Sequence, residues 1–327
     1  MIDQFGRDVN YLRLSVTDKC NLKCLYCVPE FSKEIVNESK LLTIDEYFRL
    51  TRILSVLGIK KVRITGGEPL VRKGIPELIK KINTLESIEE IALTTNGILL
   101  EKYLDELFKN GLTSLNISLD TLDEKKYNYI TRGGNLNSVI NSIDKALEYK
   151  IKIKINTVLI NGFNKDEIID LVEFSEKKGI DLRFIELMPI GCGKSLEGVS
   201  NEEILEVISR NKNIQKVEVD SSMSGPADYY LLPETKTKIG FISPLSSCFC
   251  KTCNRIRLTS EGKLKQCLYY ESKLDLKKKL RSEISDEELL EAIKSEIYFK
   301  NEKHNFLEDI DDKENNKENK IMSEIGG

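Results

Sequence analysis

The chain has 327 residues, a formal net charge of −3 and 40% hydrophobic residues, a composition that allows a sizeable core to be buried. The near-neutral charge excludes the basic excess of a nucleic-acid binder, and the sequence has neither the ~18 uninterrupted apolar residues of a membrane helix nor the apolar run of a signal peptide. We therefore expect a cytoplasmic protein without nucleic-acid or membrane partners, built as one large domain and a smaller one.

The first two-thirds of the chain alternates strand-like and helix-like segments. The strand-like segments are residues 11–17, 61–65, 90–95, 114–120, 153–160 and 181–187. One helical segment begins at a capping box of Thr43 and Glu46 and ends at Gly58, and another ends at Gly179. Six strand–helix repeats predict a parallel sheet that either closes toward a barrel or is doubly wound.

The strands each have one polar face, which favours the barrel. Successive side chains of a strand point to opposite sides, so Arg13 lies on one face and its leucine neighbours on the other. The same alternation places Lys61, Arg63 and Lys154 on polar faces. Helices would cover the apolar faces, and the polar faces would line a partly basic lumen. The sequence thus predicts an α/β fold, a partial (β/α)6 barrel of the TIM type; the alternative is an α+β sheet with exposed polar faces.

The pattern changes after residue 190. The segment "GCGKS" at 191–195 is similar to a phosphate-binding loop, but Met188 stands where that motif needs a glycine, so we interpret it as a glycine turn. Residues 214–270 are interpreted as short strands and loops, and 286–300 as a helix. The end of the chain is rich in Lys, Glu, Asn and Asp and cannot bury enough apolar surface to fold alone. We predict a barrel domain over 1–190, an α+β region over 191–300 that covers the open side of the barrel, and a charged, flexible tail over 301–327.

The eight cysteines are clustered rather than scattered. Six of them form two trios, Cys20, Cys24 and Cys27, and then Cys250, Cys253 and Cys267. In a reducing cytoplasm such groups are interpreted as metal ligands in preference to disulfides. Three ligands leave one coordination position of the metal open for chemistry. The only histidine, His304, lies in the polar tail, so a mixed Cys/His zinc site in the body of the protein is not expected. Cys192 and Cys248 have no assigned role.

Zinc is the alternative metal for the second trio, because Cys248 would raise its number of cysteines to four. Cys248 and Cys250 are separated by one residue. That is tighter than the spacing of about two to four intervening residues usual for zinc ligands, which disfavours the alternative. A non-catalytic zinc-binding interaction protein would contain zinc, whereas an iron–sulfur enzyme would contain iron and acid-labile sulfide.

The first trio has the spacing C-x3-C-x2-C with Tyr26 before its last cysteine, and the segment "RITGGEP" follows at residues 63–69. Both features resemble signature segments of the radical S-adenosylmethionine (SAM) enzymes. The resemblance implies that Cys20, Cys24 and Cys27 hold three irons of a [4Fe–4S] cluster and that SAM binds the fourth iron. It also implies that the paired glycines let the backbone approach the methionine end of SAM closely.

Further segments resemble one branch of these enzymes, the GTP 3′,8-cyclases of molybdenum cofactor biosynthesis. "LRLSVTDKCNLKCLYC", "LTTNG", "NISLD", "RFIELMPIG" and "FCKTCNRIRLT" follow one another as in that family, and "IGG" ends the chain. The resemblance extends from about residue 5 to 270 and includes the last residues. It implies conversion of GTP to 3′,8-cyclo-7,8-dihydroguanosine 5′-triphosphate, the first step of molybdopterin formation. It also implies a second [4Fe–4S] cluster on Cys250, Cys253 and Cys267, whose open iron binds guanine.

The resemblance further implies roles for single residues, each at a position that matches a motif of the family. Those that would contact SAM are Tyr26, Gly67, Ser118 and Met188. Those that would contact GTP are Arg13, Arg63, Thr94, Lys154, Arg255, Ile256 and Arg257. The basic catalytic residues would be Arg13, Lys61, Arg63 and Arg183. Arginine suits a triphosphate because a guanidinium fork binds two of its oxygens at once.

The reaction of that family also implies partners. The adenosyl radical takes the hydrogen from C3′ of GTP, and the resulting carbon radical adds to C8 of guanine. The partners would be GTP, a reducing electron donor such as flavodoxin or ferredoxin, and the next enzyme of the pathway, with the chain a monomer or a homodimer. Cys248 and the charged segment before Gly326 and Gly327 depart from the family pattern. The rival is a peptide-modifying radical enzyme, which usually has more C-terminal cysteines and no R-x-R beside a C-x2-C.

Overall fold

A computed structural model describes residues 1–30, 41–219, 225–306, 318 and 320–326. Its described strands form one sheet in the order β12-β11-β10-β1-β2-β3-β4-β5-β6-β9-β8-β7. The strands are β1 Tyr11–Ser15, β2 Lys61–Thr65, β3 Glu90–Thr95, β4 Ser114–Ser118, β5 Lys152–Thr157, β6 Asp181–Ile185, β7 Gln215–Val217, β8 Asp228–Leu232, β9 Thr237–Ile242, β10 Arg255–Leu258, β11 Lys263–Lys265 and β12 Leu274–Asp275.

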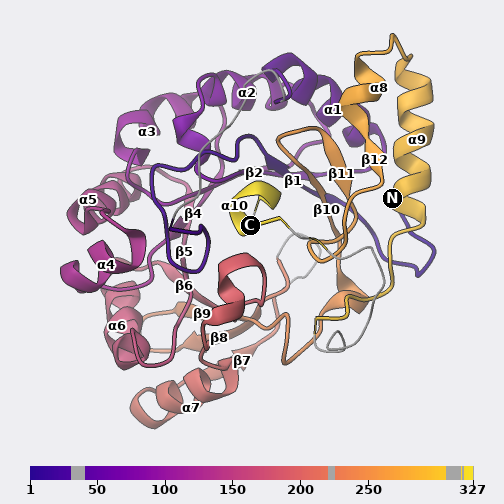
Figure 1. Cartoon of the computed structure of the whole chain (residues 1–327). Helices are drawn as coiled ribbons and strands as arrows, with labels where there is room; N and C mark the ends of the chain where they lie inside the picture. The colour runs from indigo at the N-terminus through magenta and orange to yellow at the C-terminus, as the bar shows by residue number, and fades with distance from the viewer. Residues whose placement is uncertain (31–40, 220–224, 307–317, 319, 327) are drawn as a thin grey trace.

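The helices lie mainly on the outside of this sheet (Figure 1). They are α1 Ile44–Val56, α2 Ile75–Ile82, α3 Leu100–Lys109, α4 Glu124–Thr131, α5 Leu136–Leu147, α6 Ile168–Lys178, α7 Asn201–Asn211, α8 Leu276–Leu280, α9 Asp286–Tyr298 and α10 Met322–Ile325. The exception is α10, which lies near the centre of the view inside the ring of helices. No helix in the described part of the chain is long and apolar enough to span a membrane.

The predicted partial barrel is confirmed, and the C-terminal region extends it. Strands β1 to β6 pair in parallel with their neighbours in sequence. At one edge β10 adds to β1 in parallel, and at the other β9 adds to β6 in parallel. Antiparallel strands then continue both edges. The C-terminal region therefore contributes strands to both edges of the same sheet that the first six repeats build.

Local sequence signals explain where the helices begin and end. The Thr43 hydroxyl accepts from the Glu46 backbone N–H at 3.1 Å, and the Glu46 carboxylate accepts from the Thr43 N–H at 2.7 Å, which is the predicted capping box. Gly179 ends α6 at φ 65°, in the left-handed region that glycine adopts without steric cost. The segment 191–195 forms a short 3₁₀ helix where a glycine turn was expected.

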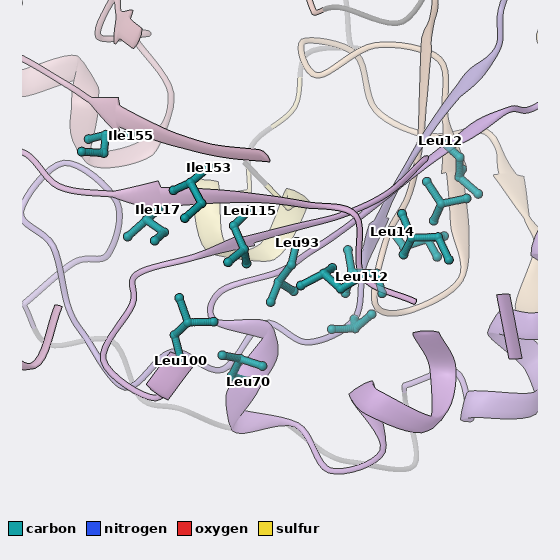
Figure 2. Packing of buried hydrophobic residues seen from close by; sticks show 14 of the residues in the cluster. Leu12, Leu14, Leu70, Leu93, Leu100, Leu112, Leu115, Ile117, Ile153 and Ile155 are labelled. Atoms are coloured by element: carbon teal, nitrogen blue, oxygen red, sulfur yellow. The ribbon is translucent and has the colours of Figure 1, made fainter. Parts of the chain in front are cut away.

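The apolar faces of the strands pack beneath the helices, as the alternation predicts. Figure 2 shows this layer of leucine and isoleucine side chains between sheet and helices. Its members are almost completely buried and include Leu12, Leu14, Leu93, Leu115, Ile117 and Ile155. The polar faces line a cavity of about 800 Å³, and Arg13, Lys61, Arg63 and Lys154 all contribute to its wall. The barrel with a basic lumen, rather than the flat sheet with exposed polar faces, is therefore the observed arrangement.

Candidate active site

The cavity gathers nearly all of the residues that the sequence predicted for a site. Both cysteine trios line it, as do the expected SAM-contacting and catalytic residues and six of the seven expected GTP-contacting residues. The exception is Ile256, which lies on β10 between Arg255 and Arg257 and is 1% exposed in the apolar core. Because side chains alternate along a strand, Ile256 faces away from the two arginines, and only its backbone could meet a ligand.

The first trio lies in the loop that follows β1. The backbone N–H groups of Cys27 and Val28 both donate to the Cys24 carbonyl, at 2.9 and 3.0 Å, so the last two cysteines sit on one tight turn. The Leu22 N–H lies 3.4 Å from the Cys20 sulfur. Burial first, and the neighbouring acidic groups next, raise the pKa of Cys24 well above its ordinary value. A positively charged metal centre would offset both effects, so three clustered thiols of this kind suit an iron–sulfur cluster.

The two glycines of "GGEP" bring the end of β2 against the cysteine loop. The Gly67 N–H donates to the Thr17 carbonyl at 2.7 Å, and the Glu68 N–H donates to the Lys19 carbonyl at 2.8 Å. A Cβ atom at Gly67 would lie 2.5 Å from the Lys19 carbonyl oxygen, which is a collision. The space that glycine leaves is thus filled by the chain's own backbone, which fixes the segment that leads into Cys20.

Three polar residues that were not predicted as site residues hold the same end of the cavity together. Asp120 accepts from the Tyr26 hydroxyl at 2.7 Å and thereby ties the cysteine loop to the end of β4. Glu68 is completely buried and accepts from the Asn96 N–H at 2.7 Å. Asn96 in turn points its amide nitrogen at the Cys20 sulfur, 3.7 Å away. All three stand in the segments "GGEP", "LTTNG" and "NISLD", which was the signal available in the sequence.

A row of three arginines crosses the sheet on the cavity side. Arg257, Arg13 and Arg63 occupy paired positions on β10, β1 and β2. Neighbouring strands lie about 4.8 Å apart, so the three like charges stand side by side. Burial first, and then the charge of Arg257, lower the pKa of Arg13 well below its ordinary value. Such a row is stabilised by an anion that carries several charges.

A second row lies one layer away, formed by Arg255, Tyr11, Lys61 and Glu90. Lys61 donates to Glu90 at 2.9 Å, and the Tyr11 hydroxyl accepts from Arg63. Burial raises the pKa of Tyr11, but the charges of Arg63 and its basic neighbours outweigh burial and bring that pKa down to about 7. Tyr11 was not predicted as a site residue, although its spacing of two from Arg13 places it on the same face.

The basic character continues around the lumen to β5 and β6. Lys154 donates to the Tyr229 hydroxyl at 3.1 Å, and Arg183 donates to the Asn156 side-chain oxygen at 3.0 Å. Arg183 is 5% exposed. Thr94 accepts from Arg63 at 3.3 Å and so joins β3 to the arginine row. The cavity wall therefore offers a continuous set of cationic and neutral donors.

The second trio lies at the opposite end of the cavity from the first trio and the GGEP segment, beside the start of β10. Burial raises the pKa of Cys250 to about 12 and also raises that of Cys267. Burial acts in the same direction at Cys253, but the positive charges of Arg255 and then Lys300 outweigh it, so the Cys253 pKa falls to about 6. A thiolate is therefore present at one of the three positions near neutral pH, which suits a metal centre.

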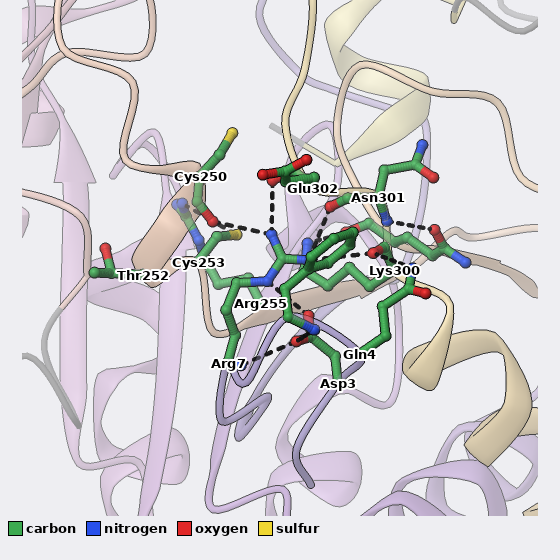
Figure 3. Close-up of polar contacts among 12 residues, drawn as sticks. Asp3, Gln4, Arg7, Cys250, Thr252, Cys253, Arg255, Lys300, Asn301 and Glu302 are labelled. Carbon is green, nitrogen blue, oxygen red and sulfur yellow. Dashed lines mark hydrogen bonds and ion pairs between the residues drawn. The ribbon is translucent and has the colours of Figure 1, made fainter.

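Arg7 joins the loop of the second trio to the N-terminal segment and to the segment that follows α9, as Figure 3 shows. Its side chain is buried and forms an ion pair with Asp3 at 2.6 Å. The two terminal nitrogens donate to four backbone carbonyls: Cys250 and Glu302 at 2.9 Å, Asn301 at 2.8 Å and Lys300 at 3.2 Å. One guanidinium therefore fixes the spacing between the cysteine loop and the segment after α9.

His304 lies against the body of the protein, whereas the sequence placed it in a polar, flexible tail. Its Nε2 atom is 3.8 Å from the Cys248 sulfur. Within the described part of the chain, Cys248, Cys250 and His304 form a compact group whose ligand atoms all lie within 4.8 Å of one another. A mixed Cys/His zinc site in the body of the protein was not expected, because composition alone placed His304 in the tail. The Arg7 contacts fold residues 300–302 back onto the cysteine loop and carry His304 with them.

The end of the chain enters the cavity. Ile325 is 1% exposed and packs with Ile190 and Leu268 in a small apolar cluster. Arg257 donates to the Gly326 carbonyl at 2.9 Å. A Cβ atom at Gly326 would lie 2.6 Å from the Ser15 side chain, so only glycine fits against β1. This part of the expected charged, flexible tail packs against the rest of the protein. The expectation of flexibility over 307–317 and the position of Gly327 lie outside the described residues.

Two family models match the chain in succession. The model described as "Radical SAM superfamily" matches residues 14–175, and the one described as "Molybdenum Cofactor Synthesis C" matches residues 180–306. The first match includes β1 to β5, except for the first three residues of β1, and the second includes β6 to β12. Cys250, Cys253 and Cys267 all fall within the second match.

Curated relatives match over the full length of both chains. One from Clostridium perfringens (strain SM101) is 53% identical over 327 residues, and one from Clostridium botulinum (strain Okra) is 45% identical over 328 residues. A relative from Desulforamulus reducens is 43% identical over 331 residues. Each match covers 100% of this chain and 100% of the relative, and all three relatives are named GTP 3′,8-cyclase.

Solved structures of lower identity share the fold. The crystal structure of Streptococcus suis SuiB bound to S-adenosylmethionine is similar with a TM-score of 0.57 and 19% identity, over 80% of this chain and 58% of that one. SuiB bound to the precursor peptide SuiA gives 0.58 and 18%, over 80% and 60%. The chain thus spans about three-fifths of SuiB, and at this identity the likeness shows the fold alone.

Proposed function

This chain belongs to the GTP 3′,8-cyclase family of radical SAM enzymes, and from that membership we infer that it converts GTP to 3′,8-cyclo-7,8-dihydroguanosine 5′-triphosphate, the first step of molybdenum cofactor biosynthesis. The observation that carries this inference is the full-length identity of 53% to a relative of that name. The basic lumen between two cysteine trios supplies a chemically suitable cavity for the reaction.

The first trio fits a [4Fe–4S] cluster. When bound there with SAM, the cluster supplies the electron that cleaves the sulfonium and yields a 5′-deoxyadenosyl radical. Cys20, Cys24 and Cys27 would each ligate one iron. Tyr26, fixed by its hydrogen bond to Asp120, would border the adenosyl group. Gly67, Ser118 and Met188, which line the same end of the cavity, would complete the SAM site.

GTP would lie along the two polar rows. The Arg257–Arg13–Arg63 row and Lys61 concentrate positive charge that a triphosphate can neutralise. Lys61 and Arg63 are buried, and Arg13 and Arg257 are half-buried, so each contact is stronger than it would be in water. Lys154, Thr94 and Arg183 extend the donors toward β5 and β6. A substrate held in this way would keep its ribose between the two trios, with water excluded from the reacting carbons.

The second trio would hold a second [4Fe–4S] cluster that binds the guanine base. Support comes from the lowered pKa of Cys253 beside Arg255, and from the positions of Cys250, which is buried, and Cys267, which is half-buried, in the wall of the lumen. The guanine would then stand beyond the ribose, so that C3′ faces the SAM end. A low-potential donor such as flavodoxin or ferredoxin would reduce the enzyme in the cytoplasm, the next enzyme of the pathway would take the product, and the chain would act as a monomer or a homodimer.

Anaerobic reconstitution with iron and sulfide, followed by reaction with SAM, reductant and GTP, tests the proposal. We expect 5′-deoxyadenosine and the cyclised nucleotide in equal amounts, identified by mass spectrometry. Formation of 5′-deoxyadenosine without a GTP-derived product would mean that the chain is a radical SAM enzyme with another substrate, such as the peptide-modifying alternative. A chain that binds neither iron nor labile sulfide after anaerobic reconstitution would overturn the iron–sulfur assignment altogether.

A further inference from the structure

Cys248, Cys250 and His304 have the geometry of a site for a single metal ion. Two ligand atoms that bind one tetrahedral zinc ion at 2.0–2.3 Å lie about 3.3–3.8 Å apart. The Cys248 sulfur and His304 Nε2 are 3.8 Å apart, and all three ligand atoms lie within 4.8 Å of one another. Only a small adjustment of rotamers would bring this group onto one ion. The mixture of two thiolates and one imidazole is a donor set typical of zinc.

The segments that carry Cys250 and His304 are held in place by hydrogen bonds, and Cys248 is open to solvent. Arg7 donates to the carbonyls of Cys250 and Glu302, so one buried guanidinium fixes both segments that carry the ligands. Cys250 is buried, whereas Cys248 is exposed and gives an ion access from solvent.

The radical SAM chemistry uses neither Cys248 nor His304. Cys248 precedes the second trio, and His304 follows α9, outside the "FCKTCNRIRLT" segment. Cys250 belongs both to this group and to the second cysteine trio. Its thiolate can bind one iron of a cluster or a single metal ion, but not both at once. An ion bound by Cys248, Cys250 and His304 therefore competes with the second cluster for Cys250.

We propose that Cys248, Cys250 and His304 form a mononuclear zinc site, and that zinc at this site and the second [4Fe–4S] cluster exclude one another. The zinc site stands on the geometry of the three side chains; the exclusion rests on the proposed function, because it needs a cluster on Cys250, Cys253 and Cys267. A fourth zinc ligand would be water, which the exposure of Cys248 permits.

Cobalt titration of the full-length chain, purified anaerobically and before reconstitution, tests the site itself. We expect one Co²⁺ per chain with the charge-transfer and visible bands of tetrahedral thiolate coordination, displaced by Zn²⁺. Cys248→Ser and His304→Ala should each weaken Co²⁺ binding by at least about 100-fold, more than the loss of a second-shell partner. Cys192→Ser, which removes a thiol elsewhere, and Cys267→Ser, which removes a cluster thiol, should leave the spectrum unchanged. Unaltered binding in Cys248→Ser or His304→Ala, or its loss in Cys267→Ser, would overturn the zinc site.

Reconstitution with iron and sulfide, with and without one equivalent of Zn²⁺, tests the exclusion. In the wild-type chain zinc should reduce the iron bound by about half, the share of one of two four-iron clusters. In Cys248→Ser the iron content should not respond to zinc. Full iron loading with zinc retained would refute the exclusion. Iron for one cluster only, with or without zinc, would refute the second cluster and the exclusion with it, while the cobalt result would still decide the zinc site.

Discussion

Tyr11 is expected to titrate near neutral pH, and Tyr11→Phe removes the group that does so. Its side chain is buried, its hydroxyl accepts from Arg63, and Lys61 Nζ lies 5.1 Å from its ring centroid. These cations favour the phenolate more strongly than burial opposes it, so the Tyr11 pKa lies at about 7 instead of its ordinary value of 10.0. A shift of about three pKa units corresponds to roughly 4 kcal/mol between the two protonation states.

The sign of the stability effect follows from that direction. The folded-state pKa of Tyr11 is depressed, so its ionisation contributes stability that is fully present above the unfolded pKa of 10.0 and is lost as the pH falls through about 7. Between these values the free energy of unfolding of the wild type should rise by up to about 1.4 kcal/mol per pH unit relative to that of Tyr11→Phe. Tyr11→Phe should lack this contribution to the pH dependence of its stability.

Difference absorbance in the tyrosinate band, taken between wild type and Tyr11→Phe at each pH, isolates this group from the iron–sulfur absorption. We expect ionisation of one tyrosine centred near pH 7. Saturating GTP, added without SAM, should raise that pKa by a unit or more, because the triphosphate takes up the positive charge that stabilises the phenolate. Tyr229→Phe is the matched control, since Tyr229 contacts Lys154 and not Arg63. Ionisation near pH 10 only, or a pKa that GTP leaves unchanged, would refute the electrostatic account of the two rows.

Three further predictions concern the two trios and the arginine row. Cys24→Ala should abolish reductive formation of 5′-deoxyadenosine, because one thiolate of the first cluster is lost; product at the wild-type rate would contradict that role. Cys253→Ala should retain the first cluster and bind about half of the wild-type iron, as measured by metal analysis, and unchanged iron would exclude Cys253 as a ligand. Arg257→Ala should keep both clusters but lower GTP affinity or turnover by about ten-fold or more, since a charge-assisted hydrogen bond is worth roughly 1.5–3 kcal/mol. Arg210→Ala, at a side chain that is 71% exposed, is its control, and equal effects of the two variants would mean that Arg257 has no specific contact with GTP.

The strand faces could be predicted from the sequence because they depend on a local rule. Alternation along β1 and β2 placed Arg13, Lys61 and Arg63 toward the lumen, and the structure agrees. The same rule, applied to "RIR", assigns Ile256 to the core, where it lies; it was included with the arginines because the family motif was taken as a block. Tyr11 was equally accessible to the rule and was missed because its pKa depends on neighbours from another strand.

Contacts that depend on distant parts of the chain could not be predicted. His304 was assigned to a polar, flexible tail because its neighbours in sequence are polar, yet Arg7 draws the preceding residues onto the cysteine loop. The docking of Ile325 and Gly326 likewise depends on Ser15 and Arg257, which no periodicity connects to the terminus. In both cases a single long-range hydrogen-bonding partner, rather than local composition, decides where the segment lies.

The pairing of β1 with β10 has a consequence for how the protein is made. Arg13 and Arg257 are partners in the sheet although about 240 residues separate them, and closing a loop of that length costs on the order of 5 kcal/mol of entropy. At a synthesis rate of roughly 5–20 residues per second, the edge of β1 leaves the ribosome about ten to fifty seconds before its partner exists. During that interval the nascent chain exposes an unpaired strand edge, which is prone to aggregation. The arginine row, and with it a complete substrate site, therefore forms only after nearly the whole chain has been translated, and a chain truncated before β10 would have the first cysteine trio but no enclosed lumen around it.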